Sequence, residues 1–207
     1  MTFLRVLSAI LLFWLACVAG VPAQQTDAPD GALKEQLDRG KQAIKNQKYK
    51  DAIEALKSAN QLKHDSCSEC YFLSAIAYFH MHDQKHAIEN CDKAIATADS
   101  DSLRGLAHNL KGNFLLSAAG DPKTVHQAEE EYQAAVEAEP KAAMFHMNLA
   151  KALLRESKDE VAKQQLQECL DCGPDETTKI EAEKLLARPE RGRKEISPEF
   201  QVTTLQG

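Results

Sequence analysis

The chain has 207 residues, enough for one compact domain or a short repeat array but not for two ordinary domains and a linker. Aromatic residues make up only 6%, and glycine and proline are few, which favours helices over sheet. The formal net charge of −6 offers no basic stripe to neutralise phosphates, which argues against nucleic acid as a partner.

The N-terminus has the pattern of an export signal. Arg5 precedes an uncharged run over residues 6–19, and Val21-Pro22-Ala23 then provides small residues for cleavage after Ala23. We therefore interpret residues 1–23 as a signal peptide and 24–30 as a linker, which predicts an exported chain, periplasmic or secreted. The run of about fourteen residues is short for a membrane span, which needs roughly twenty, and no later stretch suits one.

Two alternatives to cleavage stay open at this end of the chain. In the first alternative, the apolar run is retained as a membrane anchor. In the second, Cys17 carries a lipid, because Trp14-Leu15-Ala16-Cys17 resembles a bacterial lipobox, although Trp14 stands where a small aliphatic residue is usual.

A spaced pattern recurs in four segments after the linker. Each has an alanine, a bulkier residue four positions later and a small residue three further on. The four sets are Ala52/Leu56/Ala59, Ala87/Cys91/Ala94, Ala128/Tyr132/Ala135 and Ala162/Leu166/Cys169. A helix is predicted upstream of each set, with a small residue where two helices must touch: Gly40, Ala75, Gly112 and Ala150.

At these residues the chain resembles the tetratricopeptide repeat (TPR) family, whose unit is a helix–turn–helix. The resemblance covers about residues 33–174, and the third unit carries extra residues around Gly120. It implies an all-α, right-handed TPR solenoid, residues 31–187, with four helix–turn–helix repeats at about 33–66, 67–102, 103–141 and 142–175. Because the last hairpin needs a cover, the apolar Ile180, Ala182 and Leu185 among polar residues predict a capping helix over 175–187.

The resemblance also implies a concave groove lined by the first helix of each repeat, and a protein or peptide ligand. Spacings of three and four place one row of residues on each helix. The rows are Lys34/Leu37/Lys41/Ile44, Glu69/Phe72/Ile76/Phe79, Leu106/Asn109/Asn113/Leu116 and Met144/Met147/Lys151/Leu154. The predicted ligand contacts are Leu37, Lys41, Phe72, Ile76, Phe79, Asn109, Asn113, Met147 and Lys151.

These residues suit an extended or helical peptide. Asn109 and Asn113 offer amides for a peptide backbone, and Lys41 and Lys151 offer charge for a carboxylate. An alternative is that Phe72 and Phe79 only pack between neighbouring helices, because the helix over residues 70–81 is apolar almost all round. Neither the ligand's identity nor the oligomeric state can be derived from this pattern.

Four of the six cysteines form two Cys-x-x-Cys pairs, Cys67/Cys70 and Cys169/Cys172. Shared zinc is disfavoured, because one pair opens the second repeat and the other closes the fourth, and no histidine follows either pair for haem attachment. Cys67 begins a helix, whose dipole favours a thiolate, and export favours pairing with Cys70. A disulfide, free thiols and redox catalysis all remain open there, whereas buried free thiols are favoured for Cys169 and Cys172.

A cluster of His80, His82, His86 and Asp83 around one turn invites a metal interpretation. A solvated turn with Asp83 as a helix cap is the favoured alternative. We found no nucleophile elbow, glycine-rich phosphate loop or paired-carboxylate site. The sequence therefore predicts no enzyme, no cofactor and no resident metal.

The composition changes once more after residue 187, to a charged linker and then an alternating segment over residues 197–207. The segment runs from Ser197-Pro198-Glu199-Phe200 to Leu205-Gln206-Gly207 and resembles the first strand of redoxin or TlpA-type thioredoxin domains. Two functions follow. The chain is a non-catalytic exported scaffold, or it is the N-terminal TPR portion of a thiol-disulfide oxidoreductase whose catalytic domain lies beyond Gly207.

Overall fold

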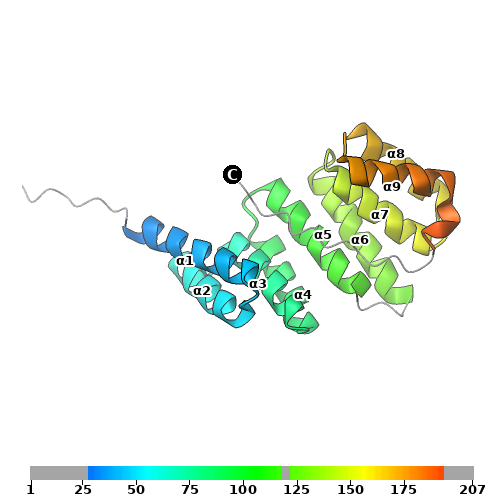
Figure 1. The fold of residues 1–207 in the computed structure, drawn as a ribbon. Coiled ribbons are helices and arrows are strands. Elements are labelled where there is room, and N and C mark those ends of the chain that lie inside the picture. The colour runs from blue at the N-terminus through cyan, green and yellow to red at the C-terminus, as the bar shows by residue number, and fades with distance from the viewer. Residues whose placement is uncertain (1–27, 118–121, 194–207) are drawn as a thin grey trace, which may run out of the picture.

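The computed structural model describes residues 28–117 and 122–193, and the predicted signal peptide and the segment over 197–207 lie outside them. In the described residues the chain is all-α, as predicted, with α-helices that pack in sequence as antiparallel pairs and no strand. Figure 1 shows the helices following one another in chain order from α1 to α9. None of the described helices is long and apolar enough to cross a membrane.

The helices pair as α1 with α2, α3 with α4, α5 with α6 and α7 with α8, and α9 packs against α8 and α7. A short 3-10 turn, Pro189–Arg191, follows α9. The bounds are α1 Ala28–Lys45, α2 Tyr49–Leu62, α3 Ser68–His80, α4 Gln84–Ala96, α5 Asp101–Ser117, α6 Pro122–Ala138, α7 Ala143–Arg155, α8 Asp159–Asp171 and α9 Glu176–Ala187.

Side chains cap the starts of four of the described helices by accepting backbone hydrogen bonds. The Cys67 sulfur accepts from the Cys70 amide at α3, and Asp83 accepts from the His86 amide at α4. Ser100 Oγ accepts from the Leu103 amide at α5, and Asp175 accepts from two amides at α9. Each cap satisfies amides that have no partner within the helix. Asp83 thus has the capping role that the sequence favoured over metal binding.

The turn inside three of the hairpins repeats one unusual backbone conformation. Gln47, His82 and Ser157 each lie two residues before the second helix of their hairpin, with φ of 59°, 61° and 59°. Residues other than glycine seldom adopt this left-handed region. The same geometry at equivalent positions shows that these hairpins repeat one backbone plan.

Within a hairpin, a small residue of the first helix receives a large side chain of the second. A Cβ added to Gly40 would lie 2.7 Å from Leu56 Cγ, and one added to Gly112 would lie 2.7 Å from Tyr132 Cε1. Ala75 and Ala150 occupy the same place in their hairpins and are fully buried. The small residues therefore let the paired helices approach closely enough to bury Leu56 and Tyr132.

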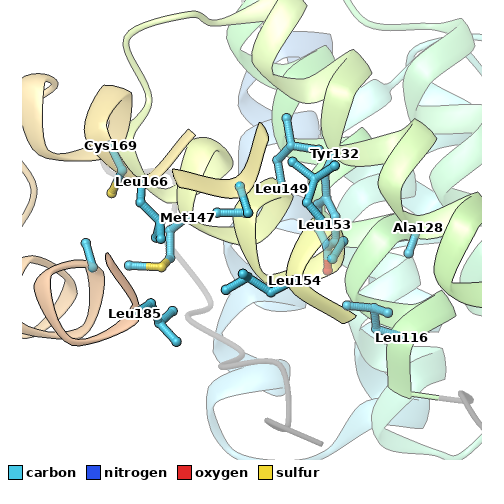
Figure 2. Packing of buried hydrophobic residues seen from close by; sticks show 14 residues of the cluster. Leu116, Ala128, Tyr132, Met147, Leu149, Leu153, Leu154, Leu166, Cys169 and Leu185 are labelled. Atoms are coloured by element: carbon cyan, nitrogen blue, oxygen red, sulfur yellow. The ribbon is translucent and has the colours of Figure 1, made fainter. Parts of the chain in front are cut away.

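The largest apolar cluster lies at the C-terminal end, where α9 covers the last hairpin. Leu185 of α9 joins Met147, Leu154 and Leu166 in this cluster, and Figure 2 shows Met147 between Leu166 and Leu185. A repeat buries its apolar face only against a neighbour, so the last one needs a cover. In this chain α9 is that cover.

Candidate functional site

The structure divides the nine predicted groove residues into a buried majority and an accessible minority. Six of them, from three successive first helices, are at most 7% exposed: Phe72, Ile76, Asn109, Asn113, Met147 and Lys151. Leu37, Lys41 and Phe79 are half-buried. Most of the residues that were predicted to line the groove are therefore buried in contacts within the chain.

The apolar members of the second row pack between neighbouring helices. Phe72 and Ile76 lie in one cluster with Leu103 and Ala107 of α5. Phe79 stacks on Phe114, with ring centroids 4.5 Å apart. This matches the packing alternative for Phe72 and Phe79.

The two asparagines of α5 are hydrogen-bonded inside the chain. The Tyr132 hydroxyl donates to Asn113 Oδ1 at 2.8 Å, and Asn148 Nδ2 donates to Asn109 Oδ1 at 2.8 Å. The first bond joins α5 to its hairpin partner α6, and the second joins α5 to the next repeat. Both carbonyl oxygens thus have buried partners without a ligand.

The last row lies beneath the capping helix. Lys151 Nζ is 2.9 Å from Glu181 Oε1 of α9, and Met147 packs beside Leu185. Gly192, which follows α9, lies against the Leu154 side chain. The carboxylate that Lys151 meets therefore belongs to this chain.

A pocket of about 420 Å³ lies at the other end of the array, among α1, the start of α3 and the loop between α4 and α5. It includes Leu37, Lys41 and Glu69 from the predicted rows, and Lys41 Nζ lies 2.8 Å from Glu69 Oε1. We call it the N-terminal pocket. Its full lining is Leu33, Leu37, Lys41, Lys63, Ser66, Cys67, Ser68, Glu69, Asp99, Ser100, Ser102 and Leu103.

Nine of these twelve lining residues are absent from the predicted rows, mostly because they come from turns and helix starts. Asp99, Ser100 and Ser102 belong to the α4–α5 loop and the first turn of α5. Their place beside α1 follows from how the repeats stack, which a periodic pattern within one helix does not encode. A cluster of serines beside a predicted helix start was the available signal.

Cys67 and Cys70 form a disulfide at the start of α3, with Cα atoms 5.2 Å apart. This is one of the three states that the sequence left open for the pair. The backbone amide of Cys67 donates to Asn60 Oδ1 at 3.0 Å. Leu33 and Leu37 of α1 pack against the apolar cluster that the two cysteines form with Ala59. The disulfide thus adjoins the N-terminal pocket.

The second pair, Cys169 and Cys172, consists of free thiols at the end of α8. Burial raises the pKa of the Cys169 thiol to about 11, and Cys172 and Asp175 add to the effect. Burial and the nearby Glu168 and Asp171 also raise the pKa of Cys172. Cys169 is fully buried, as the sequence indicated, whereas Cys172 is partly exposed.

The histidines predicted near one turn do not converge on a common centre. His80 stacks on Tyr49, while His86 Nδ1 lies 2.7 Å from Asp83 Oδ2. Burial and then the nearby His82 lower the pKa of His80.

In the described part of the chain, a three-residue group with metal-ligand chemistry lies elsewhere, at His126, Glu129 and Glu156. The Lys158 ammonium is 2.7 Å from Glu129 Oε2 and 2.6 Å from Glu156 Oε2. It already supplies the positive charge between the two carboxylates. This group is therefore an ion-pair cluster that links α6 to the α7–α8 turn.

Comparison with known proteins supports the repeat architecture. The tetratricopeptide repeat family matches residues 125–177. A crystal structure of MamA protein aligns with TM-score 0.62 and 16% identity over 79% of this chain and 84% of that chain. A second crystal structure of MamA aligns with TM-score 0.58 and 21% identity over 75% of this chain and 84% of that chain. The structure of the MamA RS-1 ArsTM double mutant aligns with TM-score 0.56 and 19% identity over 79% of this chain and 97% of that chain. No curated protein sequence matches the chain.

Proposed function

We propose that this tetratricopeptide repeat protein is an exported, right-handed solenoid scaffold that binds an extended peptide segment of a partner protein in the N-terminal pocket. The observation that carries the proposal is a difference in accessibility among the first helices of the four hairpins. The predicted contacts on α5 and α7 are closed by internal bonds and by α9, whereas α1 and α3 border an open pocket of about 420 Å³.

The lining of the pocket suits a peptide better than a charged small molecule. Leu33, Leu37 and Leu103 provide an apolar surface, and four serines add hydroxyl groups. The hydroxyls of Ser66 and Ser68 already donate to backbone carbonyls, whereas Ser102 is exposed. Lys63 and Asp99 bring opposite charges to the same opening. An apolar side chain flanked by peptide backbone matches this mixture of a few polar groups around an apolar surface.

Two features support export, one outside the described residues and one within them. Residues 1–23 have the pattern of a signal peptide. The Cys67–Cys70 disulfide suits an oxidising compartment, where such bonds form and persist. Fractionation of cells that make the chain tests this part of the proposal, and a protein confined to the cytoplasm with residues 1–23 still attached would contradict it.

A second function rests on the segment over residues 197–207. Its resemblance to the first strand of a TlpA-type thioredoxin domain supports a longer TPR–redoxin oxidoreductase. Sequencing the reading frame beyond Gly207 separates the two functions, because a downstream Trp-Cys-x-x-Cys would favour the oxidoreductase.

The pocket assignment is tested by filling the pocket. Ser102 is exposed and lines it, so Ser102→Trp should occlude the opening without disturbing the core. Ser58, exposed on α2 and outside the lining, provides the matched control Ser58→Trp. We expect immobilised Ser102→Trp to lose at least about tenfold in affinity for a captured partner, or about 1.4 kcal/mol. Equal binding by both variants would contradict the assignment.

A further inference from the structure

The two cysteines of the Cys67–Cys70 disulfide differ in their relation to the N-terminal pocket. Cys67 contributes to the pocket lining and is 5% exposed, whereas Cys70 does not contribute to it and is 1% exposed. Leu33 and Leu37 line the same pocket and pack against the cluster that contains both cysteines. A group held in the pocket therefore approaches the disulfide from the Cys67 side.

The local backbone favours negative charge on Cys67. Its sulfur caps α3 and accepts the Cys70 amide at 3.2 Å, at the helix end where the dipole is positive. The Cys67 amide is fixed by Asn60 Oδ1, and the Asn60 side chain is itself bonded to Asp65 at 3.0 Å. Cys67 would thus leave readily as a thiolate from a mixed disulfide.

The second Cys-x-x-Cys pair has the opposite environment in the same molecule. Cys169 and Cys172 lie at the C-terminal end of α8, where the dipole disfavours a thiolate. Both thiols have raised pKa values, from burial first and then from neighbouring acidic groups. The two pairs have the same spacing but lie at opposite ends of their helices. The start of α3 therefore stabilises a thiolate at Cys67, whereas the end of α8 stabilises the protonated thiols of Cys169 and Cys172.

We propose that the Cys67–Cys70 disulfide is a redox-active centre that exchanges with thiols of a ligand in the N-terminal pocket. A ligand thiolate attacks Cys67 Sγ, a new sulfur–sulfur bond forms, and the Cys67–Cys70 bond breaks with its electron pair going to Cys70, which takes a proton. A second ligand thiolate attacks the ligand sulfur of this mixed disulfide and releases Cys67. Two ligand thiols are oxidised to a disulfide, and the protein disulfide is reduced by the same two electrons.

This inference uses the pocket of the proposed function but not its peptide ligand, so the two can fail separately. The probe is glutathione, a small thiol. The wild-type chain is incubated with excess reduced glutathione, and alkylation with mass spectrometry follows the Cys67–Cys70 peptide while circular dichroism follows helix content. We expect the disulfide to be reduced with helix content unchanged. Resistance of the disulfide, or loss of helices on reduction, would indicate a purely structural bond.

A trapping variant tests which sulfur is attacked. In Cys70→Ser the resolving thiol is gone, so oxidised glutathione should leave a mixed disulfide on Cys67, at least about tenfold faster than on Cys172. In Cys67→Ser the buried Cys70 should stay unmodified. Modification of Cys172 ahead of Cys67, or of Cys70 as fast as Cys67, would overturn the proposal. If either variant fails to fold, the reduction experiment on the wild-type chain still tests the proposal.

Discussion

Lys151 Nζ of α7 lies 2.9 Å from Glu181 Oε1 of α9, and this ion pair fastens the capping helix over the last repeat. The Lys151 side chain is 9% exposed and that of Glu181 is 26% exposed, so the pair is largely removed from water. Its partial burial makes either charge costly without the other. The relationship explains why a residue on the predicted groove face is unavailable to a ligand.

Removing one partner of this pair should loosen the cap. We expect Lys151→Met to lower the free energy of unfolding by about 1–2 kcal/mol and to speed amide hydrogen exchange in α9 more than in α3. Adding Glu181→Gln should recover part of the loss, which a double-mutant cycle measures. Additive effects of the two changes would contradict the coupling.

The buried bond from Tyr132 to Asn113 should matter more than an exposed tyrosine bond of the same type. Tyr132→Phe leaves the Asn113 oxygen without this donor and should cost about 1–3 kcal/mol in denaturant unfolding. The control is Tyr71→Phe, whose hydroxyl bonds the Asp65 carbonyl at 3.2 Å near solvent. Similar losses for both variants would show that the bond to Asn113 is not a special contributor.

The close approach at Gly112 predicts opposite effects for two glycine-to-alanine changes in helices. A Cβ at Gly112 would meet the buried Tyr132 ring, so Gly112→Ala should destabilise by about 1–3 kcal/mol despite the better helix propensity of alanine. A Cβ at Gly31 would meet nothing within 4 Å, so Gly31→Ala should stabilise by about 0.5–1 kcal/mol. Thermal unfolding measures both, and a stabilising Gly112→Ala would refute the packing argument.

Glu131 should make the chain less stable in acid. Burial alone would raise its pKa, but hydrogen bonds from His108 at 2.7 Å and Lys111 at 2.6 Å outweigh burial and hold the pKa below 4.5. A lowered folded-state pKa stabilises above the unfolded value, and this stabilisation is lost as pH falls through the folded pKa. The stability difference between wild type and Glu131→Gln should therefore shrink below about pH 4.5.

Glu129 supplies the control of opposite sign. Burial, together with the neighbouring Glu156, raises its pKa despite the bond from Lys158. Its ionised form is therefore penalised in the folded state, and the penalty is relieved as pH falls through the raised pKa. Unfolding midpoints of Glu129→Gln across the same pH range should move relative to wild type in the sense opposite to Glu131→Gln. Movement in the same sense would contradict the assignment.

The repeat architecture could be predicted because it depends on the spacing of small and large residues within each hairpin. Gly112 and Tyr132 stand at fixed offsets within one hairpin, and their contact follows from helix geometry alone. The accessibility of the groove rows could not be predicted in this way. Lys151 has the periodicity of an exposed residue, but α9 returns over it, and Asn109 meets Asn148 from the next repeat.

The candidate site was predictable only in part for the same reason. Leu37 and Lys41 lie on the predicted face of α1. Asp99 comes from the α4–α5 loop and Ser102 from the first turn of α5, and the place of both beside α1 depends on repeat stacking. The Cys67–Cys70 spacing permitted a disulfide without selecting it over free thiols. Its position at a helix start beside the pocket distinguishes it from Cys169 and Cys172.

Site-specific photocrosslinking determines directly whether a partner binds in the N-terminal pocket. A photoreactive amino acid replaces Ser102 in one chain and Ser58 in another, both exposed and only the first lining the pocket. We expect a crosslink to a partner segment from position 102 and none from position 58, and we expect the free partner peptide to compete with this crosslink. Equal crosslinking from both positions, or crosslinking from position 58 alone, would contradict it.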